Sequence, residues 1–518
     1  MENKEKVIKT NRILCVVFII LFGTDIVLSA IQNNPNSDAY FLVNTGKYIV
    51  ENLQVPKTNV WTWHENFNTI VQQWLACVSN FIWFNALGNK GLVIMTLINT
   101  IIACILALKF MGLYTDNKKY KICALVVFMY IIRPFMNTRP TLITIPIILF
   151  ELITLTKFER NDIDIKKYII RMSIISLLLV NWHSSFWLYS FIIMLPFVVP
   201  AVWDIKNTDW NKIKHYLYSI PLMIICGLIN PNGIESPLYL LKSYGSITEQ
   251  IVILELRSPV VKSKQGLIIL IAVALLTFYI LKGEKIKGDT ERGSVRDKSK
   301  IYLALGTLVL ALYHIRNNWM LLFSIIQFSI ILMDNLYNFY NTWKHSDKMK
   351  YIKNLVKENK LTIKLAFSFM LICTVVIAIF SVTYNSNETD KPENTKYGDR
   401  LKEIDKAVDY LNNLNSSDIK LYNEFAEGNY LELKGIKVYI DARPELYTPQ
   451  ISGVDDNIYK EYISILLGNA DYAEILEKRN FTHLLISKDT NFNLYMSFQD
   501  NYKIVVETDT YNLYESID

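Results

Sequence analysis

Long apolar runs separated by polar loops follow one another from Ile13 to about Tyr384. A helix that crosses a membrane needs about 17–25 mostly apolar residues, and lipid leaves backbone polar groups no partner outside a helix or a closed barrel. The alternation therefore predicts a mainly α-helical, polytopic membrane protein with about eleven transmembrane helices. The predicted spans are 13–32, 91–112, 119–134, 141–157, 168–183, 185–203, 216–230, 265–282, 301–315, 319–338 and 362–384.

The distribution of Lys and Arg among the loops predicts the orientation. Residues 71–88 are ambiguous, because they can form a span or a helix that lies in the interface. As an interfacial helix they leave every later basic loop on the cytoplasmic side, as the positive-inside rule requires. This choice predicts a cytoplasmic N-terminus and an extracytoplasmic C-terminal domain. It also makes residues 33–90, called the first loop below, an outer loop with a helix from Asp38 to Asn52 and an extended segment at Pro56.

Composition divides the chain into a transmembrane domain (1–384), a polar linker (385–399) and a C-terminal α/β domain (400–518). Residues 385–518 carry 14 basic and 25 acidic side chains, a net charge of −11, against +17 for the rest. The basic excess lies in the predicted cytoplasmic loops, so it indicates topology and not nucleic-acid binding. Helical periodicity covers 400–414, and strand-like runs cover 420–424, 437–441, 483–487 and 503–508.

Several classes of chemistry have no sequence support. The chain has no Walker motif, GxGxxG, GxSxG or HExxH pattern, which argues against ATP hydrolysis, dinucleotide binding and zinc protease activity. Its six cysteines form no CxxC pair and no Cys/His spacing typical of a metal site, and none lies in the C-terminal domain.

Acidic residues at or within the membrane are the first candidates for function. Asp38 follows the first span and can act as a general base on an acceptor hydroxyl or as a metal ligand. The alternative is that it caps the following helix, since Asp is a favoured N-cap. Asp25 and Glu151 lie within predicted spans, where acids are costly and often functional. They favour a transporter, unless each simply pairs with a cation or hydroxyl in the bundle.

Basic groups at the predicted outer ends of different spans form the second set. Together they can neutralise a phosphate or pyrophosphate, although a single Arg at a span end more often anchors to lipid headgroups. Glu255 can pair with the nearby Arg. In the C-terminal domain Asp441 and Arg443 follow a predicted strand, where they form either a ligand site or a structural turn. The outer basic candidates are Arg139, His183, Arg257 and Arg316.

Short motifs in a fixed order resemble those of the GT-C superfamily, the integral-membrane glycosyltransferases that use polyprenyl-phosphate sugars. Relatives include the protein mannosyltransferases and the aminoarabinose lipid A transferases, and a largely uncharacterised group of bacterial multi-spanning proteins is closer still. The motifs span nearly the whole chain: Asp38, Gly46, Pro56 and Trp74-Leu75; Thr138-Arg139-Pro140; Asn181-Trp182-His183; Asn230-Pro231-Asn232-Gly233; Glu255-Leu256-Arg257-Ser258-Pro259; Arg316-Asn317; Glu427-Gly428-Asn429-Tyr430-Leu431; and Asp441-Ala442-Arg443.

The resemblance implies that Asp38 is the catalytic acid, with Arg139, His183 and Arg316 around the phosphate of a polyprenyl-phosphate-linked sugar. The acceptor would be a lipid, glycan or protein of the cell envelope. Where members of the superfamily often carry a second acid, this chain has Asn59 and Gln73. No metal ligand is therefore predicted, although a divalent metal stays open. Two alternatives remain: a lipid-linked saccharide transporter, and a non-catalytic envelope-assembly protein whose C-terminal domain binds a partner.

Overall fold

The computed structural model describes residues 20–203, 210–243, 258–260, 263–282, 297–344, 393–414 and 419–517. The chain divides into two compact units. The first comprises 1–110, 130–257 and 397–518, and the second comprises 111–129 and 258–396. The predicted span 362–384 and the site candidates Glu255 and Arg257 lie outside the described residues.

Four segments of the described chain are helices both long and apolar enough to cross a membrane. They match four of the predicted spans, but the predicted number of eleven is not confirmed. Other predicted spans correspond to shorter or less apolar helices. For example, the predicted span 216–230 is replaced by two short helices, α9 (Trp210–Leu217) and α10 (Ser219–Gly227). The four segments are α4 (Asn89–Met111), α6 (Thr141–Glu159), α12 (Lys264–Lys282) and Ile315–Asn338.

The first loop contains the two helices that the sequence predicts. Helix α2 (Ser37–Asn52) packs on α3 (Trp74–Leu87) so closely that a Cβ atom at Gly46 would lie 2.0 Å from the carbonyl oxygen of Cys77. Because this separation is far below van der Waals contact, only glycine allows it. The position of Gly46 thus fixes how α2 lies on its neighbour.

The first unit continues with helices that pack against one another and against α3 of the first loop. Helix α7 packs against α6, α8, α10 and α3. The 3-10 helix η1 precedes α6, and Asp25, in the helix Ile20–Gln32, pairs with Arg133 of η1 at 3.6 Å. The acid that the sequence places in the first span therefore has a cation partner. The helices are η1 (Arg133–Phe135), α7 (Ile165–Trp182), α8 (Ser185–Trp203) and α11 (Glu235–Ser243).

The second unit contains the described helices between residues 264 and 344. Helices α12, α13 and α14 contact one another, and the 3-10 helix η3 connects α13 to α14. Helix α5, which straddles the boundary between the units, spans Lys118–Ile132. The remaining bounds are Lys298–Tyr313 for α13, Ile315–Met320 for η3 and Leu321–Lys344 for α14.

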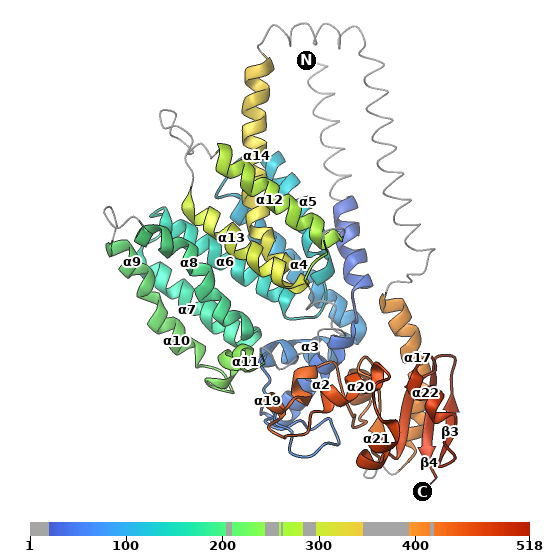
Figure 1. The fold of residues 1–518 in the computed structure, drawn as a ribbon. Coiled ribbons are helices and arrows are strands. Elements are labelled where there is room, and N and C mark those ends of the chain that lie inside the picture. Colours follow the sequence, from blue (N-terminus) through green and yellow to red (C-terminus); the bar gives the residue numbers. More distant parts are fainter. Residues whose placement is uncertain are drawn as a thin grey trace, which may run out of the picture. The chain divides into compact units, whose positions relative to one another are not determined.

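The C-terminal domain is a small sheet flanked by helices, drawn in orange and red in Figure 1. Its strand order is β1-β2-β4-β3, with β1 parallel to β2 and the other neighbours antiparallel. Helix α17 (Glu393–Asn412) begins inside the predicted linker, so the helix is longer than the sequence indicates. The strands are β1 (Leu421–Tyr422), β2 (His483–Ser487), β3 (Tyr502–Glu507) and β4 (Tyr511–Ser516); the helices after α17 are α18 (Gly428–Leu433), η5 (Pro444–Tyr447), α19 (Pro449–Ser452), α20 (Ile458–Leu466), α21 (Tyr472–Arg479) and α22 (Asn491–Met496).

The predicted strand 437–441 is wrong. This segment is not part of the sheet, and its only pairing among the described residues is a single parallel bridge between Val438 and Thr62 of the first loop. Val438 N–H donates to the carbonyl of Trp61, and Thr62 Oγ1 donates to the carbonyl of Val438 at 2.7 Å. The apolar run therefore packs against a distant loop, and local strand propensity does not reveal that partner.

Two buried acids in the C-terminal domain predict a pH-dependent stability. Burial, and next the charge of Glu427, raise the pKa of Glu424 to about 7. In the unfolded chain this pKa is about 4.3, so the folded state holds the extra proton between these values and loses stability as pH rises from about 4.3 to 7. We expect the melting temperature of the full chain in detergent to fall between pH 5 and pH 8, and to fall less in Glu424→Gln.

The Glu424→Gln side chain can still accept the Ser487 N–H, which donates to Glu424 Oε1 at 2.8 Å. The matched control is Glu477→Gln, because Glu477 is exposed on α21. It should leave the pH dependence unchanged. Equal pH profiles for Glu424→Gln and the wild type would contradict a titration of Glu424 in this range.

Candidate active site

Asp38 lies in the first turn of α2 and forms an ion pair with Arg139. The N-cap of this helix is Asn36, whose side chain accepts from the Ala39 N–H at 3.0 Å. The interpretation of Asp38 as the cap is therefore wrong, and its carboxylate points elsewhere. Asp38 Oδ2 accepts from Arg139 Nε–H, and their side chains are only 18% and 30% exposed. Two candidates from different parts of the sequence thus meet at one site.

The polar segment before α2 runs beside the segment before α6. Asn34 Nδ2 donates to the carbonyl of Met136 at 3.2 Å, and Thr138 Oγ1 donates to Asn36 Oδ1 at 3.4 Å. These bonds align Asp38 with Arg139. Sequence reasoning did not single out Asn36 or Thr138 by role, although Asn36 has the residue type and position of an N-cap.

Thr144 connects His183 to the N-terminus of α6, the helix that Arg139 precedes. The Thr144 hydroxyl donates to the carbonyl of Pro140 at 3.0 Å and lies 2.8 Å from His183 Nδ1. A hydroxyl has only one hydrogen. If the Thr144 hydroxyl donates it to the carbonyl of Pro140, then Nδ1–H of His183 donates to Thr144 Oγ1. In the neutral ring Nε2 is then the nitrogen that accepts a proton. The imidazole is buried, at the C-terminus of α7.

Asn181, in the last turn of α7, connects three segments. Its Oδ1 accepts from the indole N–H of Trp74 at 2.7 Å, and its Nδ2 donates to the carbonyl of Ile229 at 2.9 Å. Asn232 in the following corner donates to the carbonyl of Val71 at 3.1 Å. Two of the short motifs that carried the resemblance, those of Asn181 and Asn232, therefore contact residues 71–74 of the first loop, which include a third motif at Trp74.

Arg316 belongs to the second unit, where it lies in η3. Its side chain is exposed and makes no hydrogen bond or ion pair within the described part of the chain. Arg139, His183 and Asn181 belong to the first unit. The structure thus pairs Asp38 directly with Arg139. It connects His183, through Thr144, to the N-terminus of α6, which Arg139 precedes. Arg316 stays a separate candidate.

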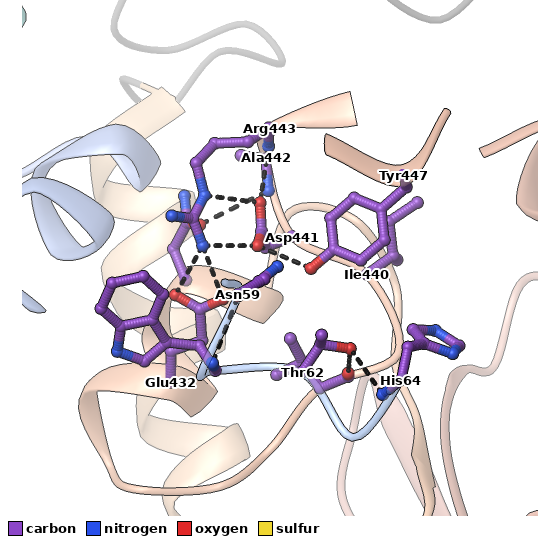
Figure 2. Close-up of polar contacts among 12 residues, drawn as sticks. Asn59, Thr62, His64, Glu432, Ile440, Asp441, Ala442, Arg443 and Tyr447 are labelled. Carbon is purple, nitrogen blue, oxygen red and sulfur yellow. Dashed lines mark hydrogen bonds and ion pairs between the residues drawn. The ribbon is translucent and has the colours of Figure 1, made fainter. Parts of the chain in front are cut away.

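Asp441 and Arg443 form a buried cluster with Glu432 and Tyr447 (Figure 2). Arg443 Nη2 lies 2.6 Å from Asp441 Oδ2 and 3.0 Å from Glu432 Oε1, and the Tyr447 hydroxyl donates to Asp441 Oδ2 at 2.7 Å. The guanidinium also lies over an aromatic ring of the first loop, 5.2 Å from the centre of Trp61. The contacts favour the structural interpretation of this motif, because they join the C-terminal domain to the first loop.

One guanidinium faces two carboxylates in this cluster. Burial, reinforced by the charge of Asp441, raises the pKa of Glu432 well above its usual value, even though Arg443 opposes the shift. Burial also acts to raise the pKa of Asp441, but the charge and hydrogen bonds of Arg443 outweigh it and lower that pKa. Arg443 therefore neutralises Asp441, and Glu432 holds a proton more readily than an exposed glutamate.

Asn59 and Gln73 stand where the resemblance leads one to expect an acid. Asn59 Oδ1 accepts from the N–H of Trp61 at 3.2 Å, while its buried Nδ2 has no hydrogen-bond partner among the residues that the structure describes. Gln73 precedes α3 and makes no side-chain cap bond. Within the described ranges no group of three or more His, Cys, Asp or Glu is arranged to hold a metal ion.

Solved structures share this fold over almost the whole chain. The structure of ArnT from Cupriavidus metallidurans bound to undecaprenyl phosphate matches with a TM-score of 0.53 at 9% sequence identity, and 97% of each chain is covered. Its apo form matches with a TM-score of 0.52 at 8% identity over 98% of each chain. No protein-family model and no curated protein sequence matches. The chain therefore has a GT-C-like fold, as the sequence motifs predict.

Proposed function

We propose that this chain is a membrane glycosyltransferase of the GT-C type. It transfers a sugar from a polyprenyl-phosphate donor to an envelope acceptor at the outer face of the membrane. The observation that carries the proposal is the pairing of Asp38 with Arg139 at the start of α2, in a fold shared with a protein solved with undecaprenyl phosphate. A carboxylate next to a guanidinium supplies a base for a hydroxyl and a cation for a phosphate.

In the proposed reaction the acceptor hydroxyl attacks the anomeric carbon and transfers its proton to Asp38. The new bond joins the acceptor oxygen to that carbon, while the bond from the carbon to the phosphate oxygen breaks. The leaving polyprenyl phosphate takes the electron pair, so its negative charge rises as the bond breaks. Arg139, with His183, stabilises this charge, and a preorganised cation acts most strongly where charge develops.

Arg139 has a geometry suited to two tasks. A guanidinium carries five N–H donors in a fixed fork, and the bond to Asp38 uses Nε–H. The same side chain can hold the carboxylate with one edge and contact a phosphate oxygen with another. Replacement by lysine would remove this fork while keeping the charge.

Binding of a polyprenyl phosphate tests the donor half of the proposal. We expect purified Arg139→Ala in detergent to bind the lipid at least about tenfold more weakly, since a charge-assisted bond contributes about 1.5–3 kcal/mol. Saturable binding should be lost in the Arg139→Ala, Arg316→Ala double variant. The dissociation constants can be measured by titration with a fluorescent or radiolabelled lipid.

The matched control is Arg133→Ala. Arg133 lies six residues earlier, is paired with Asp25 as Arg139 is paired with Asp38, and is half exposed. Arg133→Ala should keep the dissociation constant for the lipid within about twofold of the wild-type value, because an exposed ion pair contributes little. Equal dissociation constants for all four proteins would contradict a phosphate-binding role for Arg139 and also for Arg316.

One observation favours a carrier as the second candidate. Glu151 of α6 is fully buried, and although Ser190 donates to its Oε1 at 2.7 Å, its Oε2 has no partner among the described residues. A buried acid inside a span is typical of transport pathways. Passage of an intact lipid-linked saccharide across proteoliposomes, without sugar transfer, would favour this candidate over the enzyme.

A further inference from the structure

The first turn of α2 receives a hydrogen bond from the C-terminal domain. The fully buried Asn429 of α18 donates from Nδ2 to the carbonyl of Ser37 at 2.9 Å. Its Oδ1 accepts from the N–H of Ala442 at 3.4 Å, within the C-terminal domain. One amide thus bridges that domain and the residue directly before Asp38.

The backbone around Asn429 is set by close packing. A Cβ atom at Gly428 would lie 2.2 Å from the carbonyl oxygen of Ile440, so a side chain at this position would force the segments apart. The missing side chain lets α18 begin directly against the segment that carries Ala442. The amide of Asn429 is therefore held in place by the backbone on both sides of it.

Aromatic contacts hold the same turn of α2. The guanidinium of Arg443 lies 5.3 Å from the ring centre of Phe41, and the rings of Tyr40 and Tyr430 meet edge to face at 5.4 Å. Phe41 and Tyr40 directly follow the turn that holds Asp38. The C-terminal domain therefore contacts α2 just before and just after the candidate base.

Asn429 is not needed to cap the helix. Asn36 already caps α2, and the carbonyl of Ser37 belongs to the first residue of the helix, where it lies in position to accept an intrahelical bond. The bond from Asn429 is an additional one to that oxygen. Its effect is to fix the direction of the first turn rather than to satisfy an orphan group.

We propose that Asn429 is a positioning residue, which holds the first turn of α2 so that Asp38 faces Arg139. Its effect on catalysis rests on the proposed function, whereas its effect on α2 does not. The C-terminal domain then contributes to the reaction through the helix that carries the base, without touching the sugar donor.

The test compares Asn429→Ala with Asn423→Ala in the full-length protein. Asn423 is also a fully buried asparagine, but in the described part of the chain its side chain bonds only within its own domain, donating to Ile440 O at 2.7 Å and accepting from Tyr439 N–H at 2.8 Å. Hydrogen exchange of peptides covering 36–46, followed by mass spectrometry, reports on α2 without any need for activity. Transfer kinetics report on the reaction.

We expect faster exchange in residues 36–46 and an approximately tenfold lower kcat in Asn429→Ala, with the donor KM within about twofold, because a small misplacement of a reacting group is costly. Asn423→Ala should lower the melting temperature at least as much and leave both exchange and kcat unchanged. If Asn429→Ala does not fold, Asn429→Ser gives the same comparison, since its shorter side chain does not reach Ser37 O.

Wild-type exchange and kcat in Asn429→Ala would overturn the positioning role. An equal rise of exchange in both variants would also overturn it, because general packing of the domain would then explain the effect. Faster exchange confined to Asn429→Ala, together with no sugar transfer by the wild type, would uphold the positioning role and reject the proposed function instead.

Discussion

Asp38→Asn is expected to lower the rate of sugar transfer by about 10²–10⁴-fold, the usual contribution of a general base. The asparagine has nearly the same shape, and its oxygen can still accept from Arg139 Nε–H. The variant therefore loses the ability to take a proton while the packing of α2 is kept. Initial rates with a polyprenyl-phosphate sugar, measured on purified protein, give the comparison.

Two controls make this result specific. Glu51→Gln removes a carboxylate from the opposite end of the same helix, where Glu51 is exposed and pairs with Lys47 at 4.0 Å. It should transfer sugar at the wild-type rate. Asp38→Asn itself should still bind polyprenyl phosphate, since the proposed phosphate contacts come from other residues. Full activity in Asp38→Asn would reject this residue as the base.

Arg443→Ala is expected to destabilise the protein by about 3–5 kcal/mol, because it leaves a buried ion network without its cation. Asp441 and Glu432 are 0% and 3% exposed, so water cannot take the place of the guanidinium. The contacts with Phe41 and Trp61 are lost as well. Thermal unfolding of the full chain in detergent should show a fall of about 3–5 °C in the melting temperature.

A second substitution identifies the cause of this loss. Adding Asp441→Asn to Arg443→Ala removes one of the stranded carboxylates, so the double variant should recover part of the melting temperature. Lys402→Ala is the control for loss of an ordinary cation, since Lys402 pairs with Asp399 at the surface and should change stability by less than about 1 kcal/mol. A melting temperature for Arg443→Ala like that of Lys402→Ala would contradict a structural role for the cluster.

The helices of the first loop could be predicted closely from the sequence. The predicted helix from Asp38 to Asn52 is observed as Ser37–Asn52, and the interfacial helix 71–88 as Trp74–Leu87. Helix periodicity and N-terminal signals are local properties, so a single sequence reveals them. The number of spans is less accessible, because several apolar runs form helices that are short or carry too many polar residues.

Non-local pairing explains what the sequence could not predict. The run 437–441 has strand composition, but its partner is Thr62 of the first loop, and the strand between β2 and β3 is β4, which was not predicted. Asp38 and Arg139 were both predicted at one side of the membrane, yet nothing local indicates that they touch. The role of Asn429 depends in the same way on a residue at the other end of the chain.

The bond between Ser37 and Asn429 joins residues 392 positions apart. During synthesis the start of α2 emerges early and its partner among the last residues, so this turn must wait for almost the entire chain before it reaches its final packing. Contacts of such long sequence separation form late because loop closure must be completed first. A chain that stops before the C-terminal domain therefore lacks the hydrogen bond to Ser37, so the packing of the first turn of α2 depends on a segment that is made late in synthesis.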